Sequence, residues 1–223
     1  TRHDLDLLTM FANQVSVAIT NALLFQQAQR SEQALRAVNE CFLSFGTDPL
    51  DNLGAIARTT GQILNATCVL FNHKEGEQLR ILAGWQLPPD LPVLSIGAGR
   101  LCFDVIERGG DEPVIVRNLQ ESSYADTDPN VRRLGASLCV GYPVRSAHRP
   151  PSASLCAVFE SPTDLPSYQL TLLRVLGRAA AVEEERLRVE VALRASEVRF
   201  RTIIENTSVG ILAADLATGR LRF

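Results

Sequence analysis

The apolar residues near the start of the chain recur every three or four positions, which is the spacing of one face of an α-helix. They are Leu8, Phe11, Val15, Ile19 and Ala22. The pattern predicts a helix over about residues 4–45, about 60 Å long at 1.5 Å per residue and ended by Gly46. A shorter helix is predicted over 50–64, after Asp48-Pro49.

A second long helix is predicted near the other end, from about Thr163 to Asn206. Pro166 suits its first turn, because no backbone N–H is needed there. Its apolar positions include Leu172, Leu176, Ala179, Ala180 and Leu187. Residues 183–197 are rich in Glu and Arg, so we expect them to form a solvated stretch of this helix.

Short apolar and alternating runs between these helices predict β-strands. The predicted strands are 67–72, 79–85, 92–96, 112–116, 137–144 and 152–160, with short helices at 100–108 and after Asp128-Pro129. Residues 117–126 read as a polar loop suited to a lid. Strands in the middle and helices at the ends predict an α+β fold: an antiparallel sheet with the long terminal helices packed on one face.

Composition narrows the class of protein. Apolar residues make up 46% of the chain and charged residues 21%, as in a soluble globular protein. The net charge of −3 argues against binding of nucleic acid, which needs a basic face. No apolar run approaches the roughly 18 residues of a membrane span, and no signal peptide is visible. We expect a cytoplasmic segment without membrane contact of its own, whatever anchor a longer parent protein carries.

The cysteines and histidines offer no obvious metal site. The cysteines are Cys41, Cys68, Cys102, Cys139 and Cys156. They lack any CxxC spacing and have apolar neighbours, which predicts reduced core thiols rather than a zinc site. His73 and His148 lie in polar turns, and His3 lies at the start of the first helix. We expect no metal, no haem and no catalytic residue in this segment, because no nucleophile–base pair appears at a useful spacing.

Four segments in order carry a family resemblance. They are the strand 67–72, Leu94-Ser95-Ile96-Gly97-Ala98-Gly99, the segment Glu112–Val116, and the segment Arg133–Val144 with its central Gly135-Ala136-Ser137. Together they resemble a GAF domain, and we expect a complete one over residues 39–182. The resemblance implies a GAF-like antiparallel sheet and one small-molecule pocket, whose ligand the fold does not specify.

The flanking residues resemble parts of further domains. Residues 1–30 are similar to the last helix of an upstream GAF domain, and 31–46 would be a linker helix that runs into the next domain. We expect a helical linker at 183–199. Residues 200–223 are similar to the start of a truncated PAS domain.

This GAF–GAF–PAS order resembles bacterial sensor histidine kinases of two-component systems, and diguanylate cyclases share the same front end. The resemblance implies a piece of a longer signal-transduction protein. A downstream kinase or another output domain would then lie in the same chain, while the segment itself would not be an enzyme.

The known ligand signatures of GAF domains are absent from the sequence. Asn72 is followed by His73, and Phe103 lacks the acidic pair of the cyclic-nucleotide type. The cysteine that bilin-binding domains place before their fourth helix is missing from Asp126–Asn130. We therefore expect no bilin and no evident cofactor, while an unidentified small ligand stays open.

Candidate pocket residues follow from their positions in the resemblance. They are Phe71, Trp85, Cys102, Phe103, Tyr124, Cys139 and Tyr142. Cys139 and Cys156 stand on strands expected to pair, and Cys102 stands in a first helical turn, where the helix dipole favours a thiolate. A thiol enzyme of the free methionine sulfoxide reductase type is therefore an alternative function.

The long helices predict self-association. A domain of this size cannot cover both helices, so their apolar stripes need a partner, and a second copy in a parallel homodimer is the simplest one. The candidate residues of the dimer helices are Leu8, Phe11, Val15, Ile19, Leu172, Leu176 and Leu187. The expected function is a sensory or relay module that transmits signals along these helices, and the bland alternative is an inert dimerisation spacer.

Overall fold

The computed structural model describes residues 2–146, 149–206, 213–214 and 221–222, with side chains for 10, 11, 13–146 and 149–204. The chain divides into two compact units, residues 1–183 and 184–223.

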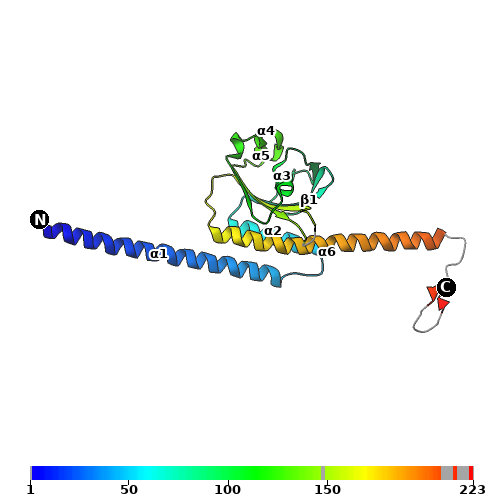
Figure 1. Ribbon diagram of the computed structural model, residues 1–223, viewed down its shortest axis with the longest axis horizontal. Helices are drawn as coiled ribbons and strands as arrows, with labels where there is room; N and C mark the ends of the chain where they lie inside the picture. Colours follow the sequence, from blue (N-terminus) through cyan, green and yellow to red (C-terminus); the bar gives the residue numbers. More distant parts are fainter. Residues whose placement is uncertain (1, 147–148, 207–212, 215–220, 223) are drawn as a thin grey trace. The chain divides into compact units, whose positions relative to one another are not determined.

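The first unit is built on an antiparallel sheet (Figure 1). Among the described residues the sheet has six strands in the order β3-β2-β1-β6-β5-β4. The strands are β1 (Cys68–Glu75), β2 (Gln78–Trp85), β3 (Leu94–Ile96), β4 (Val114–Arg117), β5 (Leu138–Val144) and β6 (Ala153–Phe159). The chain crosses from β2 and β3 through the short helices to β4 and β5, and β6 then returns to the centre beside β1.

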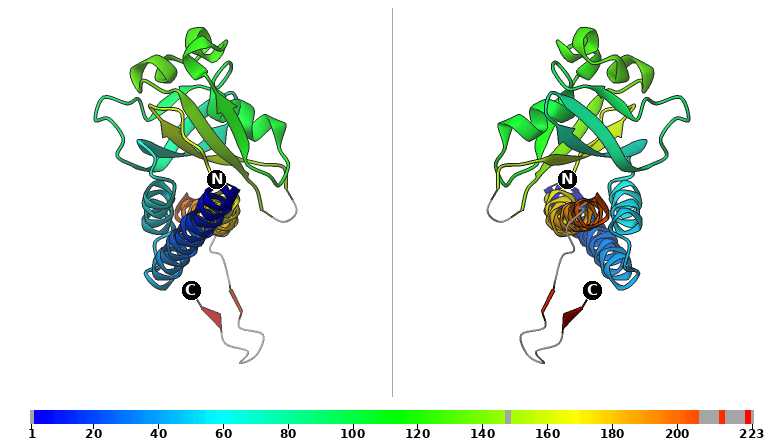
Figure 2. Two further views of the ribbon diagram at one scale, coloured as in Figure 1. Left: turned by 90° about the vertical axis from the view of Figure 1, so that its left-hand side faces the viewer. Right: turned by 90° about the vertical axis from the view of Figure 1, so that its right-hand side faces the viewer.

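Three helices cover one face of the sheet, as the end-on views show (Figure 2). They are α1 (Arg2–Leu43), α2 (Pro49–Leu64) and the first part of α6 (Ser167–Asn206). Alternate strand residues such as Phe71 and Leu155 point to this face and are completely buried. Among the described side chains of α1, those of its last part take part in this core, through Ala34, Val38 and Cys41.

Shorter elements cover the opposite face. They are α3 (Leu101–Arg108), the 3-10 turn η1 (Leu119–Glu121), α4 (Tyr124–Thr127) and α5 (Pro129–Arg133). The strand residues that alternate with those of the first face, among them Cys68, Leu70 and Val158, form a second core beneath these elements. The antiparallel sheet and the helices packed on one face are therefore as the sequence predicts.

A close contact holds α6 against the sheet. A Cβ atom at Gly177 would lie 2.1 Å from Cδ1 of the Tyr142 ring, so only glycine lets the helix approach β5 this closely. The Tyr142 hydroxyl donates a hydrogen bond to Asp111 Oδ1 at 2.9 Å, and Arg178 pairs with the same carboxylate. These two donors hold the pKa of Asp111 below its usual range.

A second buried contact joins α6 to the start of α2. Asn52 Nδ2 donates hydrogen bonds to Glu183 Oε2 at 2.8 Å and to the Gly46 carbonyl at 3.1 Å. The Gly46 N–H in turn donates to Asn52 Oδ1 at 2.8 Å. Asn52 and Glu183 are both buried. The turn between α1 and α2 is thereby fastened to the last residue of this unit.

The second unit contains the rest of α6 and two short strands, β7 (Ala213–Ala214) and β8 (Leu221–Arg222), which pair antiparallel. Arg194 pairs with Glu190 one turn away, and Arg188 Nε donates to Glu185 Oε2 at 2.9 Å. The predicted helix end at Asn206 is confirmed. Much of the expected start of a PAS domain, 207–212 and 215–220, lies outside the described residues.

Several elements begin or end at other residues than the sequence predicts. The strand expected at 92–96 covers only Leu94–Ile96, and α6 begins at Ser167, just after Pro166 rather than at Thr163. The expected polar loop 117–126 is wrong: it contains η1 and most of α4, because Leu119 is completely buried and anchors it. Within the described part of the chain, no helix combines the length and apolar character that a membrane crossing requires.

Candidate functional site

A small cavity lies between the sheet and the short helices. Its volume is about 30 Å³. Its walls come from β1, β5, β6, α3, η1 and the segment around α5, namely Leu70, Leu101, Cys102, Leu119, Asp128, Asn130, Val131, Leu134, Ala136, Cys139 and Val158. Pockets for small organic molecules measure about 300–1,000 Å³, so this cavity admits one or two atoms or waters unless its cover moves.

The Asp128 carboxylate is the main polar group of the cavity wall. Asp128 Oδ2 accepts a hydrogen bond from the Leu101 N–H at 3.1 Å, and Oδ1 accepts one from the Asn130 N–H at 3.1 Å. The carboxylate therefore caps α3 and α5 together, where the helix dipoles favour a negative charge.

An arginine completes this buried group. Arg100 Nη1 lies 3.2 Å from Asp128 Oδ1, and the side chains are only 14% and 6% exposed. Arg100 Nε donates a further hydrogen bond to the Ile96 carbonyl at 2.8 Å. The positive charge thus lies beside the first turn of α3, next to the cavity.

The cover of the cavity is cross-linked by hydrogen bonds. Gln120 Nε2 donates to the carbonyls of Val131 at 3.0 Å and Ala136 at 2.9 Å, which joins η1 to α5 and the turn after it. The Tyr124 hydroxyl donates to Asp104 Oδ2 at 2.7 Å, which joins α4 to α3. These contacts fix η1 and the short helices relative to one another around the cavity.

Four of the five cysteines meet at this place. Cys68 of β1 and Cys139 of β5 both pair with Val158 of β6, and Cys156 stands two residues earlier on the same face of β6. Cys102 approaches from α3. The Cys102 thiol donates a hydrogen bond to Cys156, and the Cys156 thiol donates one to Cys139.

The environment keeps these thiols protonated. Burial raises the pKa of Cys68 to about 12. The hydrogen bond to Cys156, with burial, raises the pKa of Cys102 well above its ordinary value. The hydrogen bond that Cys139 accepts from Cys156 lowers its pKa, but burial together with the nearby Cys102, Cys68 and Asp128 raises the pKa by more. At Cys156, the hydrogen bond accepted from Cys102 lowers the pKa, but the bond to Cys139 together with burial raises it by more. A thiolate nucleophile is therefore not favoured at neutral pH.

The structure separates the predicted pocket residues into two groups. Cys102 and Cys139 line the cavity. Phe103 and Tyr124 lie on the same side of the sheet without lining it; Phe103 lies under Lys74 Nζ, at 4.7 Å from the ring centre. In the described residues, no three or more His, Cys, Asp or Glu side chains are arranged to hold a metal ion together.

The other predicted pocket residues lie across the sheet from the cavity. Phe71 and Tyr142 belong to the core beneath the long helices, and Trp85 packs against it, over Gly61 of α2. Neighbouring residues of a β-strand point to opposite faces of the sheet. Residues that face the long helices therefore cannot also line this cavity.

The predicted dimer residues also fall into two groups. Phe11, Val15 and Ile19 of α1 are 67%, 39% and 55% exposed. Leu172 and Leu176 are instead buried against the sheet of their own domain, and Leu187 is half-buried. The side chain of Leu8 lies outside the described residues.

Comparison with solved structures shows which fold this is. The GAF domain of a phosphoenolpyruvate-protein phosphotransferase from Coxiella burnetii is similar with a TM-score of 0.60 and 13% identity, over 73% of this chain and 98% of that one. The GAF domain assigned to a sensor histidine kinase of Pseudomonas syringae pv. tomato gives 0.54 and 14%, over 77% and 98%.

An enzyme shares the architecture as well. Free methionine-R-sulfoxide reductase from Neisseria meningitidis, in complex with its substrate, gives a TM-score of 0.57 and 14% identity, over 72% of this chain and 93% of that one. No family model matches the sequence. No curated protein matches it either. At these identities the likeness shows a GAF-like fold and not a shared ligand or activity.

Sequence reasoning missed the polar centre of the site. The sequence indicates only that Asp128 starts a helical turn, and it places Arg100 only at the start of the helix expected at 100–108. The Asp-Pro pair is a recognisable N-cap signal, but nothing in the sequence shows that the same carboxylate also caps α3, 27 residues away.

We predict that the Asp128→Ala substitution lowers the free energy of unfolding by about 2–4 kcal/mol, because it removes two caps and leaves Arg100 buried without its carboxylate. Asp126→Ala is the matched control, since Asp126 pairs with Arg132 while 80% exposed. The control should change stability by less than about 0.5 kcal/mol. Urea unfolding of both variants measures the difference, and equal effects would contradict the assigned role of Asp128.

Proposed function

We propose that this chain is a sensory relay module of a cytoplasmic bacterial signal-transduction protein, with a sensor histidine kinase as the expected parent. The GAF-like fold supports the sensory class. The proposal rests on one further observation: the segment that follows α3, a helix of the cavity wall, forms ion pairs with α6, the helix that leaves the domain. The proposed order of GAF, GAF and PAS domains comes from the sequence resemblance alone.

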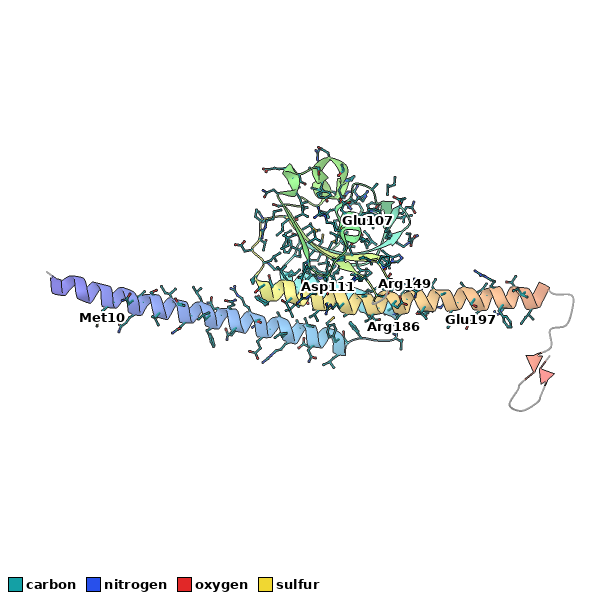
Figure 3. The ribbon with its side chains drawn as sticks, viewed as in Figure 1. Met10, Glu107, Asp111, Arg149, Arg186 and Glu197 are labelled. Atoms are coloured by element: carbon teal, nitrogen blue, oxygen red, sulfur yellow. The ribbon has the colours of Figure 1, made fainter. Side chains whose placement is uncertain are left out.

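Residues 109–112, between α3 and β4, make this connection. The first turn of α3 forms part of the cavity wall through Leu101 and Cys102, and its far end leads into this segment. Asp111 and Glu112 then pair with α6, and Glu112 Oε1 lies 2.9 Å from Arg174 Nη1. Figure 3 shows Asp111 beside α6. A shift of α3 would therefore be transmitted to α6 through these ion pairs, without a rearrangement of the apolar core.

Signal output in this proposal runs along paired helices. Met10, Phe11, Val17 and Leu23 of α1 are 59–67% exposed, and Met10 projects into solvent in Figure 3. Such apolar side chains on a long helix favour a second copy of the chain as a partner, in a parallel homodimer. Leu172 and Leu176 are excluded from this role because they fill their own core.

One structural observation favours the thiol-enzyme alternative: four cysteines lie close together beneath the short helices. Their burial and raised pKa values weigh against it, because thiol chemistry needs an accessible thiolate. An inert spacer would use the same dimer helices but would not transmit any change.

We predict that insertions of one to four residues near Ala192, in the full-length protein, change output activity in a periodic way. Each residue rotates the downstream helix by about 100°, so activity should drop and then recover as the register returns near four residues. The activity of the output domain, assayed in each variant, measures this. Output that is independent of insertion length would support the inert spacer and overturn the relay.

We predict that the Phe11→Cys variant forms a disulfide-linked dimer on mild oxidation. Phe11 meets its own copy only in a parallel pair, because an antiparallel pair would separate the two positions by on the order of 30 Å. Asn13→Cys is the matched control, since it stands on roughly the opposite side of α1 and is also exposed. Non-reducing electrophoresis measures the product. A monomer by sedimentation at high micromolar concentration, or equal cross-linking of the control, would contradict the dimer.

A further inference from the structure

An open cleft lies at one end of the sheet, apart from the small cavity. Its volume is about 660 Å³, within the range of about 300–1,000 Å³ that sites for small organic molecules occupy. One wall is the loop after β2, with Gln86, Leu87 and Pro88, and another is the turn 132–135 after α5. The start of β1 and Glu160, just after β6, complete the lining. The cleft can therefore hold a molecule that the cavity is too small to admit.

Part of the lining of the cleft is apolar. Leu87 and Pro88 are half-buried, and Leu134 is 9% exposed. Leu87 folds back over its own strand, because a Cβ atom at Gly84 would lie 2.3 Å from Leu87 Cδ1. These side chains offer a surface on which an apolar group of a ligand can be removed from water.

A positively charged side chain connects two walls of the cleft. Arg133 Nη1 donates a hydrogen bond to the Asp90 carbonyl at 3.2 Å, so Arg133 reaches from the turn after α5 to the loop after β2. Arg133 Nε lies 3.9 Å from Asp90 Oδ2, which is too long for a hydrogen bond, and the two side chains are 39% and 70% exposed. Arg132 adds a second guanidinium, which pairs with the exposed Asp126. Exposed ion pairs contribute little stability, so a ligand carboxylate can replace Asp90 at Arg133 at little cost.

A negatively charged side chain lies at the same turn. Glu160 Cγ lies 3.7 Å from the place where a Cβ atom of Gly135 would stand, and the Glu160 N–H donates to Thr67 Oγ1 at 3.2 Å. Gly135 follows Arg133 by two residues, so their Cα atoms are at most about 7 Å apart. In the described part of the chain, the Glu160 carboxylate forms no ion pair with a Lys or Arg side chain. Opposite charges therefore flank one short turn of the cleft wall.

We propose that this cleft binds a free α-amino acid with an apolar side chain. Arg133 receives the carboxylate of the amino acid, Glu160 receives its ammonium group, and the apolar lining receives its side chain. A simple carboxylic acid is repelled by Glu160, and a simple amine is repelled by Arg133. The proposal rests on the sensory role above, for which it names the class of ligand.

The cleft also borders the elements that lead to α3. Leu134 lines both the cleft and the small cavity. It directly follows α5, and Asp128, the N-cap of α5, caps α3 as well. A ligand that packs against Leu134 therefore acts on α5, and through Asp128 on α3, where the proposed relay begins.

Isothermal titration calorimetry of the 223-residue chain tests the site. The probes are L-leucine and L-phenylalanine, each with the two analogues that lack its ammonium or its carboxylate group: 4-methylpentanoate and 3-methylbutylamine, and 3-phenylpropanoate and 2-phenylethylamine. We expect one amino acid to bind per chain. Each of its analogues should bind roughly 10- to 100-fold more weakly, because it leaves one charged side chain without a partner. Failure of both amino acids to bind at millimolar concentration, or equal binding by an amino acid and either analogue, would overturn the proposal.

Two substitutions locate the site. Glu160→Gln should weaken amino-acid binding by roughly 10-fold or more and strengthen binding of the matching carboxylic acid, because it removes a like charge. Arg133→Gln should weaken amino-acid binding similarly and strengthen binding of the matching amine. Arg36→Gln is the matched control, since Arg36 pairs with Glu32 on α1 while 72% exposed, and it should bind as the wild type does.

The opposite responses of the analogues separate recognition from damage to the fold. A variant that is merely misfolded would lose all ligands together, so a uniform loss in both variants would overturn the assigned roles of Glu160 and Arg133. None of these results would affect the insertion and cross-linking experiments, which test the relay and the dimer separately.

Discussion

The close approach of α6 to the sheet is the constraint on which the rest of the domain depends. Gly177 lets the helix reach the ring of Tyr142, and the Tyr142 hydroxyl then meets Asp111, which also holds Arg178. One contact therefore fixes three things together: the position of the exit helix, the register of β5 beneath it, and the segment that follows α3. The buried Asn52–Glu183 hydrogen bond extends the same fastening to the turn between α1 and α2.

The two faces of the sheet have different physical roles. The helix-covered face is filled by large, completely buried side chains such as Phe71. The opposite face carries small sulfur-containing residues and a buried Arg100–Asp128 pair beneath short helices. Buried charges contribute little net stability but need their partners. In the proposed relay, this is the face at which a change of ligand or charge would move α3, and through it α6.

The periodicity of apolar residues predicted most of the fold, because burial on one face imposes a period of 3.6 on helices and 2 on strands. The strand expected at 79–85 is Gln78–Trp85, and the helix expected at 50–64 is Pro49–Leu64. The site was harder to predict. Cys68, Cys102 and Cys139 come from separate elements, and their meeting depends on how distant strands pair. Position alone also could not tell which aromatic residues, such as Tyr142, face away from the cavity.

The central claim is that α3 and α6 move together through segment 109–112. Hydrogen–deuterium exchange on the Asp111→Ala/Glu112→Ala variant tests it most directly, because this variant removes both ion pairs to α6 and leaves the apolar core intact. The account predicts faster exchange in both 101–108 and 170–181, with α2 (49–64) unchanged as an internal reference. Faster exchange confined to residues 109–112 would contradict it, since α3 and α6 would then be held by the core independently of each other.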